Sequence, residues 1–449
     1  MKPAVLAAGL LAAAIALAGP GAAAQSTTEA TAAAPAPAPP PPDKLFGNLG
    51  GLTDAWESHG ITLGLDWISE FAANVSGGLR TGSTSANQLG FTADIDWEKL
   101  AGLRGFSTHV IFVNRSGNNT SNMIGDQISP VQEIFGAGGD VAVHLVSAYG
   151  EESLFNDRLD IAAGWMNVEN DFASSPLYCT YMNNELCGDP KALPGGDIGH
   201  SAYPEAVWGG RIRVRPTPDT YVTTGVYTVN QDLYGPNDRS GFEFSEPRIS
   251  GVYVPIQLGY EPKFGGGQLP GHYVIGFGYD TSRFNNWALP ASAGGQVSTH
   301  NGNTQFWLLV DQMLMRNGPG DQDGVIALAG FVRNDPNNTS YGQQYYAGVM
   351  DNGFWRARPQ DGAAFLFTYF AESGPMGKVQ AEEQELGLPF SNGATGIQTH
   401  EMFLEANYNI HVWRGVDFRP EFQYVIRPNA QSNIRNAFVV GFRAHISFF

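Results

Sequence analysis

Apolar and polar residues alternate along the last part of the chain, between Ala437 and Phe448. One face of this stretch carries Phe438, Val440, Phe442, Ala444, Ile446 and Phe448. The residues between them are Val439, Gly441, Arg443, His445 and Ser447. Successive side chains of a β-strand point to opposite faces. The pattern therefore predicts an amphipathic strand that ends in an aromatic residue.

The same alternation recurs from residue 61 onward, for example over residues 89–98, 208–215, 273–280 and 401–408. About sixteen such segments can be counted. They begin near residues 61, 88, 105, 140, 159, 206, 221, 251, 271, 304, 324, 344, 361, 398, 416 and 436. Each segment has one apolar side and one polar side, which predicts an all-β fold.

The connections between these segments alternate in length. Those after the first, third, fifth, seventh, ninth and thirteenth segments are long, and those after even-numbered segments are short. Long external loops and tight periplasmic turns are typical of transmembrane antiparallel β-barrels. Residues 61–449 are therefore predicted to form a barrel of about sixteen strands, with its apolar face toward outer-membrane lipid and its polar face toward water.

The region before residue 61 falls into three parts. Residues 1–24 have the early cation Lys2, an apolar stretch and small residues, which predicts a cleavable export signal. Residues 25–42 are nearly all Ala, Pro, Thr and Ser, which predicts an extended, disordered arm. Residues 43–60 are expected to lead into the first strand, with a short helix over 52–58 that could cap or plug the barrel.

Charge and cysteine content narrow the function classes. The chain has 25 Lys and Arg residues against 43 Asp and Glu residues, a formal net charge of -18. This balance argues against nucleic acid as a partner. Cys179 and Cys187 are the two cysteines, and in an exported chain they are expected to form a disulfide. The alternative is half of a metal site, but no CxxC motif or nearby His pair supports one.

A series of motifs occurs in order between residues 45 and 448. They are Leu45–Leu52, Gly60–Leu65, Asn170–Cys179 with Cys187–Gly188, Ser201–Pro204, Trp208–Gly209, Gly225–Tyr227, Leu269–Tyr273, Asp311–Leu314 and Glu421–Tyr424. Together they resemble the carbohydrate-selective OprB-type porin family. The resemblance implies a Gram-negative outer-membrane channel through which sugars such as glucose diffuse without a cofactor. It leaves open whether the barrel is a monomer or a homotrimer.

The residues expected to line the channel are those on the polar faces of the strands. Arg211, Arg213 and Arg215 share one face and are predicted to form a basic ladder along the bore. Alternatively, they are structural arginines that pair with carboxylates of neighbouring strands. The other candidates are Asp94, Asp96, Asp280, Trp307, Asp311, Glu401, Glu405, Arg419 and Glu421.

Two of these expectations concern how a sugar would be recognised. A sugar pore needs many weak, exchangeable hydrogen bonds and gains from an aromatic plate for the C–H face of the ring. Trp307 is the candidate plate, although an interfacial belt position is the commoner role for tryptophan. The long connection from about Val168 to Pro204, which contains both cysteines, is expected to fold into the bore and narrow it.

No catalytic or metal-binding residues are predicted. His400-Glu401 begins like a zinc HExxH motif, but the fifth position is Leu404 and the setting is a strand. The first alternative to a sugar channel is a general or cation-favouring porin, which the acidic composition would suit. A remote alternative is an outer-membrane barrel hydrolase, which would need two carboxylates at a defined separation or an activated nucleophile.

Overall fold

The computed structural model describes residues 44–135, 140–235, 240–287, 298–390 and 392–449. The predicted export signal (1–24) and Ala/Pro-rich arm (25–42) lie outside these residues.

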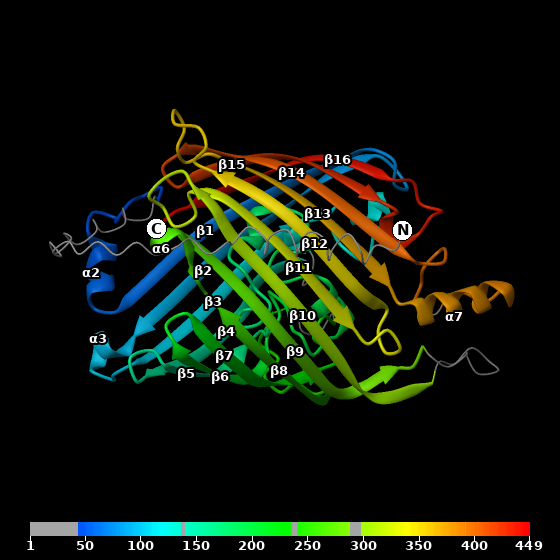
Figure 1. Ribbon diagram of the computed structural model, residues 1–449, viewed down its shortest axis with the longest axis horizontal. Helices are drawn as coiled ribbons and strands as arrows, with labels where there is room; N and C mark the ends of the chain where they lie inside the picture. The colour runs from blue at the N-terminus through cyan, green and yellow to red at the C-terminus, as the bar shows by residue number, and fades with distance from the viewer. Residues whose placement is uncertain (1–43, 136–139, 236–239, 288–297, 391) are drawn as a thin grey trace, which may run out of the picture. The chain divides into compact units, whose positions relative to one another are not determined.

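Within the described residues, sixteen antiparallel strands close into one barrel (Figure 1). Each strand pairs with its neighbours in sequence, and β1 pairs with β16. The strands are Ile61–Ser76 (β1), Gly82–Asp96 (β2), Phe106–Gly117 (β3), Val141–Leu154 (β4), Leu159–Met166 (β5), Val207–Thr217 (β6), Thr220–Asn230 (β7), Ile249–Tyr260 (β8), Leu269–Asn285 (β9), Thr299–Arg316 (β10), Gly324–Asn334 (β11), Tyr341–Asn352 (β12), Gly362–Glu372 (β13), His400–Trp413 (β14), Val416–Ile426 (β15) and Ala437–Ser447 (β16). The predicted fold class is confirmed.

The connections alternate in length as predicted, with two exceptions. The longest is the loop between β5 and β6, residues 167–206, whereas β6 and β7 are joined by residues 218–219 alone. The first connection is the short turn 77–81 rather than a long loop, and the connection between β11 and β12, residues 335–340, is shorter than both of its neighbours. β2 begins at Gly82, six residues before the apolar alternation does, and Gly82 pairs with Asn74 of β1. The start of β2 is rich in Ser, Thr and Asn, so hydrophobic alternation did not reveal it.

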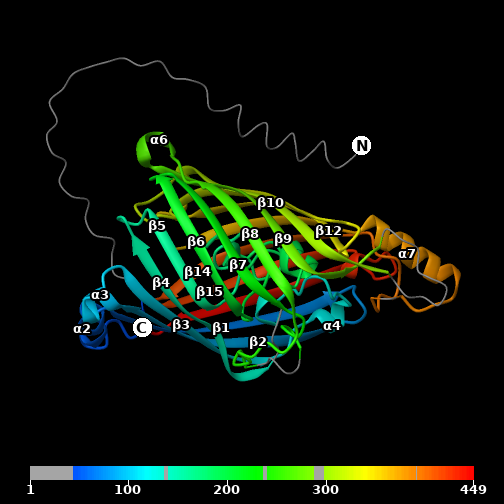
Figure 2. The same cartoon turned by 90° about the horizontal axis from the view of Figure 1, so that it is seen from below.

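Short helices lie at both ends of the barrel and within the inward loop 167–206. The α-helices are Leu52–Ser58 (α2), Trp97–Ala101 (α3), Ser121–Ile124 (α4), Ala192–Gly196 (α5), Phe264–Gly267 (α6) and Gly374–Glu385 (α7), and the 3-10 turns are Glu133–Phe135 (η1), Tyr178–Thr180 (η2) and Pro428–Ala430 (η3). Figures 1 and 2 show α2, α3 and α6 at the end with the C-terminus and the short turns, and α7 at the opposite end. None of the helices in the described part of the chain is long and apolar enough to cross a bilayer.

The outward face of the barrel is apolar and aromatic. Ile212, Phe277, Phe365 and Phe422 are exposed there, whereas polar residues such as Gln344 and Thr368 are buried inside. On the final strand, the ring of Phe442 lies 5.3 Å from that of Phe71 and 5.1 Å from that of Phe418. The last strand therefore has the two faces that its sequence predicts.

The buried core lies inside the barrel, between the wall and the loop 167–206. Phe172, Tyr178 and Leu193 of this loop pack with wall residues that include Tyr227 and Trp307. The indole of Trp307 lies directly against Gly276, because a Cβ at this position would be only 2.1 Å from Cε2 of the tryptophan. A side chain at position 276 would therefore collide with the tryptophan.

The lead-in segment is hydrogen-bonded to the last residues of the chain. The amide of Leu45 donates to the carbonyl oxygen of Ser447 at 2.8 Å, and the amide of Phe46 donates to that of Phe448 at 3.0 Å. The rings of Phe46 and Phe448 stack with centroids 5.7 Å apart. These contacts place α2 beside the end of the barrel that carries the short turns (Figure 1).

Candidate permeation path

Among the described residues, two cavities meet the peptide between Cys179 and Thr180: Cys179 lines one of them and Thr180 lines the other. The larger has a volume of about 1060 Å³ and is lined by residues of the inward loops and the wall, among them Glu133, Cys179, Cys187, Tyr203 and Arg443. The smaller has a volume of about 240 Å³ and is lined by Thr180, Asn407, Asn409, Arg419 and residues near the short turns. The peptide Cys179-Thr180 therefore separates the two spaces.

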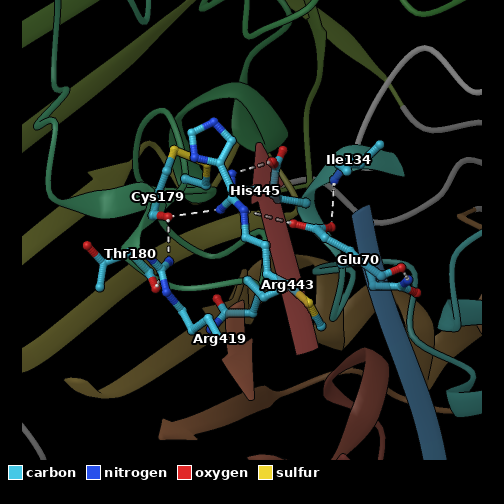
Figure 3. Close-up of polar contacts among 12 residues, drawn as sticks. Glu70, Ile134, Cys179, Thr180, Arg419, Arg443 and His445 are labelled. Atoms are coloured by element: carbon cyan, nitrogen blue, oxygen red, sulfur yellow. Dashed lines mark hydrogen bonds and ion pairs between the residues drawn. A yellow bond between two sulfur atoms is a disulfide. The ribbon is translucent and has the colours of Figure 1, made fainter. Parts of the chain in front are cut away.

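Two arginines meet this peptide from adjacent strands. Arg419 of β15 and Arg443 of β16 are directly paired in the sheet. Nη1 of Arg443 donates to the carbonyl oxygen of Cys179 at 2.9 Å, and Nη1 of Arg419 donates to that of Thr180 at 2.7 Å (Figure 3). Carbonyl oxygens between the two guanidinium groups offset the repulsion between like charges. The last two strands thus present a pair of cations at the boundary between the cavities.

Carboxylates from a loop and from the first strand flank Arg443. Nη2 of Arg443 lies 3.4 Å from Oε1 of Glu133, and Nε lies 3.9 Å from Oε1 of Glu70. Oε2 of Glu70 accepts a hydrogen bond from the amide of Ile134 at 3.2 Å (Figure 3). Hydrogen-bond donors and acceptors therefore lie next to one another at the floor of the larger cavity.

The predicted disulfide between Cys179 and Cys187 is confirmed, with sulfur atoms 2.00 Å apart. Both cysteines are partly exposed and line the larger cavity. The loop that was expected to fold inward does so, and the disulfide closes the part of it that contacts Arg419 and Arg443. Arg419 was among the predicted residues. Arg443 was placed on the inward face by the alternation, but nothing in the sequence showed that it meets this loop.

The arginine ladder on β6 points into the barrel and is paired with carboxylates. Nε of Arg211 donates to Asp171 at 2.7 Å and its Nη2 donates to Glu151 at 2.8 Å, and Arg211 is 5% exposed. Nη1 of Arg215 donates to Glu261 at 2.7 Å. The guanidinium carbon of Arg213 lies 5.4 Å from the ring centroid of Tyr221. Arg211 therefore also fastens the inward loop to the wall, because Asp171 belongs to that loop.

Trp307 lies on the inward face as predicted but does not face a cavity. It is 0% exposed, and its Nε1 donates to Oε1 of Gln257 at 3.0 Å. The ring of His200, from the inward loop, meets it edge-on at 6.0 Å. The expectation that Trp307 is an open stacking plate is corrected by this placement. Alternation gives the face of a residue but not whether a loop covers it.

Several of the acidic residues that were predicted to line the channel contact loop residues instead of facing an open cavity. Oδ2 of Asp311 accepts a hydrogen bond from Oγ of Ser175 at 3.0 Å, and Asp280 is fully buried beside Gly199. Glu401 accepts a hydrogen bond from the amide of Ala430 at 3.3 Å. Glu421 is 1% exposed and accepts one from Gln423 at 2.6 Å. All four carboxyl groups are inside the barrel; the first three contact loop residues, whereas the donor to Glu421 lies on the same strand, β15.

The remaining predicted channel-lining residues, Asp94, Asp96 and Glu405, lie in three different environments. Asp96 lies outside the narrow part of the bore, because its Oδ1 accepts from the amides of Glu98 and Lys99 and caps α3 at the short-turn end. Oδ1 of Asp94 lies 2.6 Å from Nδ1 of His109 on the inner wall. Glu405 is buried and accepts hydrogen bonds from the loop residues Met182 and Asn183. The structure thus brings Arg419 and Glu405 together through one loop segment and leaves Asp96 apart.

The inward loops also contain buried carboxyl groups. Burial raises the pKa of Glu185 to about 7, with a smaller contribution from the nearby Asp126. Burial likewise raises the pKa of Asp126 to about 6. Oε2 of Glu185 accepts a hydrogen bond from Nε2 of Gln344 on β12 at 2.8 Å. Glu185, a group whose pKa is raised by burial, therefore attaches the loop to the wall at this point.

The chain is similar to known porins in both sequence and fold. Residues 80–448 match the family described as "Carbohydrate-selective porin, OprB family". Porin B of Pseudomonas aeruginosa is 27% identical over 420 residues, covering 90% of this chain and 91% of that protein. The putative porin QuiX of Acinetobacter baylyi is 26% identical, covering 90% of this chain and 93% of its own length. The high-pH structure of Pseudomonas putida OprB, 24% identical, superposes with a TM-score of 0.83 and covers 91% of this chain and 99% of that one.

Proposed function

Since the chain belongs to the OprB family of carbohydrate-selective porins, we propose that sugars cross its barrel past the pair Arg419 and Arg443. The protein is a sugar-specific porin of the Gram-negative outer membrane. The observation that carries the proposed route is the position of the arginine pair, at the peptide that separates the two cavities.

The proposed mechanism is passive diffusion with exchange of hydrogen bonds. A sugar hydroxyl both donates and accepts, so it needs donors and acceptors side by side where water is removed. At this point the guanidinium groups are donors, and the carboxylate of Glu133 and the carbonyl oxygen of Cys179 are acceptors. These protein groups are partly exposed and already hydrogen-bond to one another. They therefore compete with a sugar hydroxyl for the same partners, so the sugar is released again and moves on.

The arginine ladder is the second part of the proposal. Arg211, Arg213 and Arg215 lie on β6, far around the barrel from β15 and β16 in the order of the strands. We infer that the ladder and the arginine pair border the bore from different sides, and that arginines and carboxylates that face each other across the bore set a transverse field. The exposed aromatic residues on the outward face are the proposed contact with outer-membrane lipid, and glucose is the proposed small permeant.

A cation-favouring porin is the second candidate, because the chain carries a formal net charge of -18. The family and the barrel indicate a channel rather than an enzyme. Liposome swelling separates the two candidate channels when glucose, sucrose and a charged solute of similar size to glucose are compared. We expect glucose to enter faster than a cationic solute of its size. Entry that follows size and positive charge alone would contradict carbohydrate preference at this path.

A further inference from the structure

Glu405 grips the inward loop through hydrogen-bond donors of two successive residues. It lies on β14 and is 1% exposed. Its Oε1 accepts from the amide of Met182 at 3.0 Å, and its Oε2 accepts from the amide of Asn183 at 3.0 Å and from Nδ2 of Asn183 at 2.7 Å. Successive backbone amides that point at one anion form a concave anion site. The carboxylate therefore fixes the chain at residues 182 and 183.

A hydrogen-bond chain connects Glu405 to a carbonyl oxygen that accepts from one of the arginines. Nδ2 of Asn407 donates to Oε1 of Glu405 at 3.0 Å and to the carbonyl oxygen of Thr180 at 3.0 Å. That carbonyl oxygen also accepts from Arg419. Only Tyr181 separates Thr180 from Met182 in the chain. A displacement of residues 182 and 183 would therefore move the acceptors of both Arg419 and Arg443.

We propose that Glu405 is a positioning residue for ion and sugar selectivity, which acts through the Cys179 and Thr180 carbonyl oxygens on Arg419 and Arg443. This inference rests on the proposed function of that arginine pair. Glu405 is covered by the loop, so it does not touch a permeant itself. Its role differs from the channel-lining one that the sequence suggested.

The chemistry requires a carboxylate at this position. All the groups that contact its two oxygens, namely the amides of Met182 and Asn183 and the side-chain amides of Asn183 and Asn407, are donors. Glutamine has nearly the same shape but would direct an NH₂ group at some of them. Two buried donors that face each other leave both without an acceptor, which is unfavourable. The variant Glu405→Gln should therefore release the loop segment without opening a cavity.

The test measures ion selectivity of the purified full-length protein in planar bilayers. Reversal potentials in a potassium chloride gradient are compared for wild type, Glu405→Gln, Arg419→Ala/Arg443→Ala and the triple variant. We expect Glu405→Gln to shift the reversal potential toward cation preference, in the same direction as the arginine variant. In the triple variant, Glu405→Gln should add little further shift, because its target is already absent. Glu385→Gln on the exposed surface of α7 is the control for the loss of one negative charge.

Each outcome decides the inference. Additive shifts, or a wild-type reversal potential in Glu405→Gln, would show that Glu405 does not act through the arginines, while leaving the arginine pair itself in place. An unchanged reversal potential in Arg419→Ala/Arg443→Ala would overturn both the pair and its positioning. Heat-modifiable migration on gels verifies that each variant folds. If Glu405→Gln does not fold, Asn183→Ala removes one donor and keeps the carboxylate, and unaltered selectivity in that variant counts against the proposal.

Discussion

Nη1 of Arg443 donates to the carbonyl oxygen of Cys179 at 2.9 Å, so the last strand of the barrel is bonded directly to the disulfide-closed segment of the inward loop. The two residues are 264 positions apart in the chain. Their contact joins the wall of the barrel to the loop at the floor of the larger cavity.

The arginine pair should decide ion preference. Replacing Arg419 and Arg443 together with Ala removes two positive charges from the boundary between the cavities, so cations should meet a lower electrostatic barrier there. We expect the cation-to-anion permeability ratio to rise by a factor of a few and glucose discrimination in liposome swelling to weaken. The control is Arg104→Ala/Arg158→Ala, which removes two exposed charges near the short turns. Equal ratios in the two double variants would contradict the prediction.

The ladder on β6 should contribute through both charge and loop attachment. Replacing Arg211, Arg213 and Arg215 together with Ala should raise conductance to cations and blunt sugar discrimination. Loss of Arg211 also leaves Asp171 and Glu151 without their shared cation, which is costly for groups that are largely buried. Arg215→Ala alone should have a smaller effect, because its pair with Glu261 is partly exposed. Pores that keep their ion preference and sugar flux in the triple variant would show that the ladder does not border the path.

The disulfide should stabilise the loop that separates the cavities. It closes a loop of nine residues, which the chain-entropy relation equates with about 2.6 kcal/mol. We expect Cys179→Ser/Cys187→Ser to lower the temperature at which the folded form on gels converts to the unfolded form. Wild type treated with dithiothreitol should behave in the same way, because both cysteines line a cavity. A conversion temperature equal to that of the untreated protein in both cases would refute the prediction.

Gly276 should be intolerant of any side chain. A Cβ there would lie 2.1 Å from the buried indole of Trp307, and the surrounding core leaves the ring little space to move. We expect Gly276→Ala to destabilise the barrel by about 1–3 kcal/mol, measured by thermal unfolding in detergent. Gly374→Ala is the matched control, because no atom lies within 4 Å of a Cβ at that position. Similar unfolding temperatures for the two variants would be inconsistent with the packing described.

Loop attachment should weaken as pH rises. The ordinary pKa of a glutamate, which applies to the unfolded chain, is 4.5, and burial raises that of Glu185 to about 7 in the folded protein. The folded form therefore binds the proton more tightly than the unfolded form. The stabilisation from this group is therefore complete below pH 4.5 and is lost as the pH rises through 7. Glu185→Gln should reduce the difference between thermal transitions measured at pH 5 and pH 8. A difference as large as in wild type would exclude Glu185 as its source.

The sequence predicted the architecture because a barrel wall repeats one simple rule. Phe442 and Arg443 lie on opposite faces as their alternation requires, and the starts of most strands lie close to the predicted positions. The site was harder to predict for a physical reason. Alternation distinguishes inside from outside, but Trp307 and Glu405 are both inside and both covered by a loop whose path depends on contacts between residues far apart in sequence. Asp96 shows a second limit of the alternation pattern, which does not reveal where a strand ends. β2 ends at Asp96, and the carboxylate of this residue caps α3.

The pairing of β1 with β16 has a consequence for assembly of the protein. β1 is synthesised before the other strands, but one of its two pairing partners, β16, is synthesised after them. Until that seam forms, each end of the growing sheet has unpaired amides and carbonyls that hydrocarbon cannot satisfy. A chain that lacks β16 would therefore leave the edge of β1 unpaired, and the barrel could not close in this register.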